Sequence, residues 1–370
     1  MNPRERLMRT LRGERGDRVP LMLDGFEFMS RAEVDAAPDA GVREIANRIF
    51  DCTAAFVACP SFVNRYLVTP PQYIKEVARA EREGKVFITS VVDTPRGKLT
   101  ALTAQDRITP GTVWTVKYPV ESLEEIEKIR SVPWELPSEL APPDVSQLPA
   151  GFNERGVLST SISSPFVCVA GMMPYQYFLE LCATHLELIK QLTGQCLQRI
   201  ASVLEVLLRG RTIDYVWMGG CEWLTPPMGS LRLYEELVQQ FERPLIERIH
   251  AGGAISHIHC HGNVRSTLEL VIERGGDFFE PVEPPPDGDI TFAEAKALAA
   301  GRITLGGNVE ARVIENEGLE AVEQATRKAF EGGKQRMVLK TTAGPIAPLT
   351  PTTVANYHRL IDVWEELSEL

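Results

Sequence analysis

Residues 255–280 read ISHIHCHGNVRSTLELVIERGGDFFE and predict a strand, a helix and a second strand in succession. The histidine-rich start alternates side chains in the manner of a β-strand. Thr267–Gly275 is predicted to be a helix, and Asp277–Pro281 is predicted to be the next strand. Strands that alternate with helices form parallel βαβ units, so this stretch indicates an α/β protein with a parallel sheet.

The same alternation extends along most of the chain. Further strands are predicted at 19–23, 54–59, 156–161, 213–219, 303–307 and 337–340, and helices at 3–12, 41–50, 175–193, 231–251, 291–298 and 319–331. At least six strand and helix units after residue 150 favour a (β/α)8 TIM-type barrel over an open doubly wound sheet. No G-x-G-x-x-G motif follows the first strand, which argues against a dinucleotide-binding fold.

Two segments depart from this pattern. Residues 73–118 show alternating β-type patterns with turn residues and no long helix, so we expect an N-terminal β-hairpin insertion, a candidate interface for a homodimer. Residues 131–150 carry five prolines and predict a surface crossing with little regular structure. We therefore expect residues 1–370 to form a single barrel domain.

Composition narrows the class of protein. The chain has 44% apolar and 24% charged residues and a formal net charge of -11, which argues against nucleic acid as a partner. Its seven cysteines form no CxxC pair and no even framework, and this favours a reducing compartment. No apolar run approaches the roughly 18 residues of a membrane span. We expect a cytoplasmic protein.

His257, His259 and His261 are three of the six histidines in the chain. Their spacing of two on a strand puts all three imidazoles on one face and turns Ile258 and Cys260 to the other. Neutral imidazole is a common zinc ligand, so the strand end could hold a metal. The alternative is a polar strand end with hydrogen-bonded histidines and no metal.

Chemistry in a (β/α)8 barrel is located at the C-terminal ends of its strands. The polar residues predicted at these ends are Asp24, Cys221, Glu222, His259, His261, Glu280, Glu283, Asn308, Glu310, Lys340, Thr341 and Thr342. Glu222 either completes a metal shell or acts as a general base, or else caps the next helix. Cys221 is either a thiolate ligand or a small core residue, and Cys260 is a weaker candidate because alternation turns it away from the histidines.

Lys340 and the residues around it complete the candidate site. Lys340 either binds an anion or forms a buried ion pair with one of the acids. Glu280 lies in a proline-stiffened acidic loop that could fix where its carboxylate points. We predict Asp24, Glu222 and Lys340 as catalytic residues and Glu280, Asn308 and Phe26 as substrate-binding residues.

Several stretches together resemble the uroporphyrinogen decarboxylase superfamily, which includes zinc-dependent, cobalamin-linked methyltransferases. They are RERLMRTLRGERGDRVPLML, VDTPRGKLT, HCHGN, GGDFFEPVEPPPDGD, GGNVE and TTAGPIAPLTPTTVANYHRLID. The resemblance covers most of the chain and implies a distorted (β/α)8 barrel with its active cleft at the C-terminal mouth.

The chain departs from both branches of that superfamily. The decarboxylases carry an arginine-rich segment after the first strand, where this chain reads DGFEFMSR, so the resemblance does not extend to uroporphyrinogen decarboxylase activity. The methyltransferases bind zinc through a His-x-Cys-Gly element and a later cysteine. Here His259 matches the histidine, His261 replaces the first cysteine and Gly344 stands about where the second would be. A harder ligand set suits polarising oxygen or activating water.

The resemblance implies a metal-dependent methyltransferase that acts on a small methylated substrate. His259 and His261 would bind zinc, with Glu222 as third ligand and Cys221 or His257 as substitutes, and a corrinoid-binding protein would be the partner that supplies methylcobalamin chemistry. One alternative is a metal-free decarboxylase or lyase for a small carboxylated, porphyrinogen-like substrate, in which Lys340 holds a carboxylate. Another is a non-catalytic binder of a corrinoid or tetrapyrrole.

Overall fold

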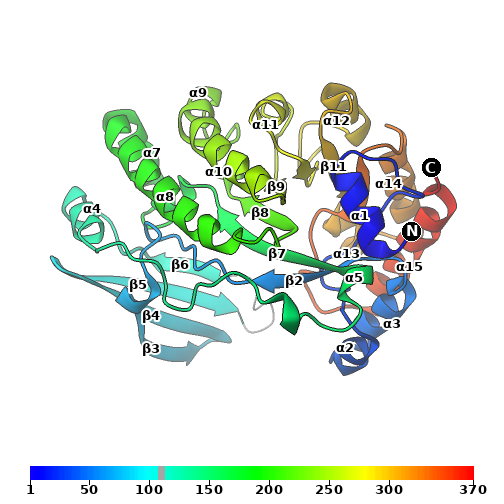
Figure 1. Ribbon diagram of the computed structural model, residues 1–370, viewed down its shortest axis with the longest axis horizontal. Helices are drawn as coiled ribbons and strands as arrows, with labels where there is room; N and C mark the ends of the chain where they lie inside the picture. The colour runs from blue at the N-terminus through cyan, green and yellow to red at the C-terminus, as the bar shows by residue number, and fades with distance from the viewer. Residues whose placement is uncertain (107–112) are drawn as a thin grey trace.

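The computed structural model describes residues 1–106 and 113–370, and its centre is a curled sheet of eight parallel strands (Figure 1). In sheet order the strands are β1 (Leu21–Met22), β12 (Met337–Thr341), β11 (Thr304–Val309), β10 (Phe278–Glu280), β9 (Ile255–His259), β8 (Tyr215–Gly219), β7 (Gly156–Ser163) and β2 (Ala55–Cys59). The predicted (β/α)8 fold is confirmed. In the described part of the chain no backbone pairing joins β1 to β2, so the barrel is distorted at that seam.

Helices surround the sheet. They are α1 (Pro3–Leu11), α2 (Arg31–Ala36), α3 (Ala40–Ile49), α4 (Leu123–Arg130), α5 (Phe152–Arg155), α6 (Val167–Ala170), α7 (Tyr175–Thr184), α8 (Leu186–Leu207), α9 (Leu231–Tyr234), α10 (Gln240–Ala251), α11 (Leu268–Glu273), α12 (Phe292–Ala299), α13 (Ala311–Asn316), α14 (Leu319–Phe330) and α15 (Pro351–Leu367). The helix predicted over 175–193 is two helices, which meet at His185. No helix in the described ranges has the length and apolar character needed to cross a bilayer.

The insertion is larger than the predicted hairpin. It is a four-stranded antiparallel sheet of β3 (Ile74–Arg82), β4 (Lys85–Thr94), β5 (Gly97–Asp106) and β6 (Val113–Lys117), set beside the barrel in Figure 1. Residues 107–112 of the predicted insertion lie outside the described residues. The proline-rich stretch 131–150 has one short 3-10 turn at Val145–Gln147, as its composition predicts.

Alternation on β9 places its side chains in two different environments. Ile255 packs inside the barrel with Tyr215 and with Leu7 and Leu11 of α1, which closes the N-terminal end. Ile258 points outward into the core between the sheet and the helices. His257 and His259 therefore face the barrel interior, as the spacing of two predicts.

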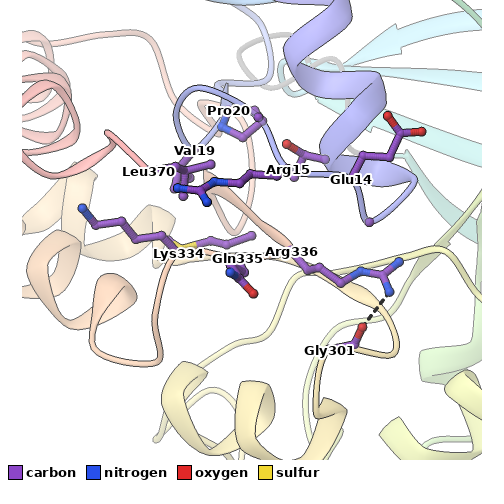
Figure 2. Close-up of a pocket in the computed structure, with 13 residues that line it drawn as sticks. Glu14, Arg15, Val19, Pro20, Gly301, Lys334, Gln335, Arg336 and Leu370 are labelled. Atoms are coloured by element: carbon purple, nitrogen blue, oxygen red, sulfur yellow. Dashed lines mark hydrogen bonds between the residues drawn. The ribbon is translucent and has the colours of Figure 1, made fainter.

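A separate cavity of about 370 Å³ opens at the N-terminal face of the barrel (Figure 2). It lies among residues that precede β1, β11 and β12, where Arg336 Nη1 donates a hydrogen bond to the Gly301 carbonyl at 2.6 Å. This face of a (β/α)8 barrel contributes to stability rather than to chemistry. We therefore expect the functional site at the opposite, C-terminal end of the strands.

A buried ion pair joins two neighbouring helical segments. Arg274 Nη2, directly after α11, lies 2.8 Å from Glu242 Oε2 of α10, and both side chains are fully enclosed. Replacing Arg274 by Met leaves the Glu242 charge buried and unpaired, which we expect to cost about 3–5 kcal/mol of unfolding free energy in urea denaturation. Arg302→Met is the matched control, because the Arg302–Glu269 pair is half exposed. Similar losses in both variants would contradict this account.

Candidate active site at the barrel mouth

A cavity of about 540 Å³ opens at the C-terminal ends of the strands. Its polar lining comes from β7, β8, β9 and the loop after it, β10, β12 and the loop after β1. The ionisable side chains that line it include Asp24, Tyr215, His257, His259, His261, Glu280 and Lys340. The structure thus brings most of the predicted site residues to one cavity.

Glu280 is the centre of this arrangement. Strand register sets it beside His259 across the β9–β10 pair. Its Oε1 lies 2.7 Å from His257 Nε2 and 2.7 Å from His259 Nδ1, and its Oε2 lies 2.7 Å from Lys340 Nζ. The role predicted for Glu280 is substrate binding, and in the structure its two oxygens lie next to His257, His259 and Lys340.

Lys340 connects Glu280 to the loop after β1. Its ammonium also lies 3.1 Å from Asp24 Oδ2. Burial alone would raise the pKa of Glu280, but Lys340 and His257 outweigh it and hold that pKa well below its ordinary value. Burial would likewise lower the pKa of Lys340, and the two carboxylates raise it instead. Of the two alternatives for Lys340, the structure therefore has the buried ion pair.

His257 is held as a neutral ring. Burial lowers its pKa to about 4, and its Nδ1 is hydrogen-bonded to the Tyr215 hydroxyl. His257 Nε2 is buried and, despite its closeness to Glu280, has no aligned hydrogen bond. A neutral imidazole whose Nδ1 is fixed by a neighbour and whose Nε2 is unsatisfied is suited to ligate a metal.

His261 belongs to a second pair nearer the solvent. Its Nδ1 lies 2.9 Å from Glu283 Oε1, and Glu283 Oε2 accepts the Gly262 N–H at 2.6 Å. Burial lowers the pKa of His261, but the hydrogen bond and charge of Glu283, together with the charges of Glu280 and Glu222, outweigh it and the net shift is upward. Its ring centroid is 4.7 Å from that of His259, so the pair borders the Glu280 group without joining it.

Cys221 and Glu222 lie on a turn that leaves the barrel. Gly220 adopts a left-handed φ of 112° after β8, and Cys221–Trp223 then form a short 3-10 turn. The Cys221 side chain enters the core outside the sheet, where Cys260 is its neighbour. The hydrogen bond to Cys260 and burial both raise the pKa of the Cys221 thiol well above its ordinary value. Without a metal, this cysteine is a protonated core thiol.

Two groups of metal-ligating atoms converge within 4.8 Å in the described residues. One is His257, His259 and Glu280, and the other is Cys221, Glu222 and Cys260. The predicted set of His259, His261, Glu222 and Cys221 is therefore divided among three places. The first group fits zinc, since two imidazoles and a carboxylate form a known catalytic ligand set and leave a position open.

Two predicted substrate-binding residues do not line this cavity, and Gly344, which stands where the resemblance implies a cysteine, is closely packed. The Phe26 ring is enclosed in the core, with its centroid 4.7 Å from that of Tyr357, so it does not line the cavity. Asn308 lines a different cavity, near Pro284 and Phe292. At Gly344 a Cβ atom would lie 3.0 Å from the Asp24 carbonyl, so the residue that replaces a cysteine leaves little space for one.

Sequence reasoning missed two members of the site. Tyr215 is a buried tyrosine on β8, and its position two residues before Trp217 on the inner face was the available signal. Glu27 also lines the cavity, accepts the Leu23 N–H at 2.5 Å, and has a pKa raised well above its ordinary value by burial and by Asp24. Neither side chain directly follows a strand, and positions that directly follow strands are where the fold predicts functional residues.

Comparison with known proteins defines the class. The family model described as uroporphyrinogen decarboxylase (URO-D) matches residues 99–367, and the chain belongs to this family. A solved methyltransferase from Methanosarcina mazei is 14% identical, with a TM-score of 0.61 and coverage of 99% of both chains, and it shares the fold. A B12-independent methionine synthase from Shewanella sp. W3-18-1 is 10% identical, with a TM-score of 0.43 and coverage of 80% of this chain and 75% of its own. No curated protein matches the sequence.

Proposed function

We propose that the protein is a metal-dependent methyltransferase that acts on a small methylated substrate at the barrel mouth. The observation that carries the proposal is the convergence of His257 Nε2, His259 Nδ1 and a Glu280 oxygen within 4.8 Å. Membership of the URO-D family and a fold shared with a methyltransferase support the reaction class. A corrinoid-binding protein is the partner that this reaction would use.

The residues around Glu280 would have distinct roles. His257, His259 and Glu280 would hold zinc, which when bound polarises the oxygen or sulfur of a substrate. The Tyr215 hydroxyl orients His257 through its Nδ1. Lys340 keeps Glu280 ionised and so available as a ligand. Asp24 borders the cavity from the loop after β1 and is the carboxylate placed to accept a substrate proton there.

The alternative of a carboxy-lyase has less support. A substrate carboxylate needs an uncompensated cation, and the Lys340 ammonium is already shared by Glu280 and Asp24. Arg31, the arginine of the DGFEFMSR segment, pairs with Asp51 at 2.8 Å and does not line the cavity. Methyl transfer needs no such cation, and we therefore favour it.

Metal content distinguishes the ligands. We expect about one zinc per chain after loading and dialysis of the wild-type protein, because three ligands and a water complete a four-coordinate shell. His257→Ala, His259→Ala and Glu280→Gln each remove one ligand and should lose most of the metal. His261→Ala is the matched control and should retain it, since His261 pairs with Glu283.

The outcome also separates the two ligand sets. If His261→Ala loses zinc and His257→Ala keeps it, the ligands are those expected from the sequence and not the Glu280 group. If all four variants and the wild type hold the same amount, no zinc site exists at the mouth. Methyl transfer from candidate methylated donors to cob(I)alamin, followed by visible absorbance, then tests the reaction class on the loaded wild type and on Glu280→Gln.

Tyr215→Phe tests the positioning of His257. The substitution removes the hydroxyl bound to Nδ1 and leaves the ring and the metal ligands in place. Loss of such a supporting contact weakens metal binding by about 10–100-fold. The measurement is competition with a chromogenic zinc chelator, with circular dichroism as the check on folding. An unchanged zinc affinity would show that Tyr215 does not orient His257.

A further inference from the structure

A second cavity, of about 500 Å³, adjoins the barrel mouth and is not used by the Glu280 group. Its apolar wall consists of Tyr118, Tyr175, Trp223 and Met228. Glu222, Glu283 and His261 supply its charged groups. Tyr118 follows β6, so the insertion contributes one wall of this aromatic pocket.

The aromatic wall is ordered by its own contacts. The Tyr175 and Trp223 rings meet edge to face with centroids 5.8 Å apart, and the Tyr175 hydroxyl donates to the Trp223 carbonyl. The guanidinium carbon of Arg65 lies 5.2 Å from the Trp223 ring centroid, so this indole already attracts a cation of the chain. Because these contacts already order the rings, their electron-rich faces can bind a cation with little further loss of side-chain entropy.

The charge of the pocket is negative. Glu283 Oε1 lies 2.9 Å from His261 Nδ1. Glu222 Oε2 accepts the Gly220 N–H at 3.1 Å, and no ion pair joins Glu222 to a cation within the described ranges. Glu222, which forms no ion pair in the described ranges, and the rings of Tyr118 and Tyr175, which are not covered by Arg65, repel anions and favour a cation. A hydrated inorganic cation would contact mainly the carboxylate, whereas an organic ammonium would contact both the carboxylate and the ring faces.

We propose that the aromatic pocket binds the methylated ammonium head group of the substrate. This inference rests on the proposed methyltransferase function and names its substrate class. Methyl groups on nitrogen spread the positive charge over an apolar surface, which matches aromatic faces beside a carboxylate. His261 lines both this pocket and the barrel-mouth cavity, so the two cavities adjoin at this residue.

Calorimetric titration with choline and with 3,3-dimethylbutan-1-ol, its uncharged isostere, tests the assignment on the zinc-loaded full chain. Choline should bind about tenfold more tightly than the isostere, because only choline gains from the carboxylate and the ring faces. Glu222→Gln preserves shape and should weaken choline binding about tenfold while leaving the isostere unchanged. Trp223→Leu should weaken choline binding as well. Trp114→Leu, on the exposed face of β6, is the control and should have no effect.

The outcomes separate this inference from the proposed function. Equal affinities for choline and the isostere, or choline binding that survives Glu222→Gln unchanged, would overturn the pocket assignment even if zinc is bound. If choline binds Glu280→Gln and chelator-treated wild type as tightly as it binds the zinc-loaded wild type, the pocket is supported irrespective of the metal. Trp223 packs against the core, so the folding of Trp223→Leu is checked by circular dichroism. If this variant misfolds, the isosteric Glu222→Gln decides the test.

Discussion

The carboxylate of Glu280 is 1% exposed and meets side chains from two other strands. An ionised carboxylate cannot be buried without compensation, so the surrounding groups have to supply positive charge and hydrogen bonds. Lys340 supplies the charge from β12, and the histidines of β9 contact the other oxygen. The mouth of the barrel is organised by this requirement, because the strand register that brings β9, β10 and β12 together also determines which side chains can meet it.

The same constraint explains why polar groups near the mouth separate into different environments. Side chains that face the barrel interior, such as His257 and His259, share one enclosed network with Glu280. Cys221 and Cys260 face the opposite side of the sheet, where the hydrogen bond to Cys260 and burial raise the pKa of the Cys221 thiol. Glu222 lies on the turn between these regions, lines the aromatic pocket and brings a carboxylate oxygen near the two thiols. The ligands predicted from the sequence are thus divided by the sheet itself.

The fold could be predicted from the sequence because it depends on repeated local patterns. The spacing of two on β9 correctly predicted that His257 and His259 share one face, and the succession of strands and helices predicted the (β/α)8 barrel. The partner of the histidines could not be predicted in the same way. Glu222 follows β8, which pairs with β9, but the left-handed Gly220 redirects the chain, whereas Glu280 ends a strand in register with His259. The turn at Gly220 and the register of β10 with β9 together separate the two acids.

Gly344 packs closely against the loop after β1. A Cβ there would lie 3.0 Å from the Asp24 carbonyl, so a side chain at 344 would require this carbonyl to shift by a few tenths of an ångström. The Asp24 carboxylate pairs with Lys340, which also pairs with Glu280, so Gly344 borders the charged network of the mouth. A metal held there by imidazole and carboxylate is harder than one held by sulfur, and it would favour substrates whose reacting group is bonded to nitrogen or oxygen over thiol acceptors.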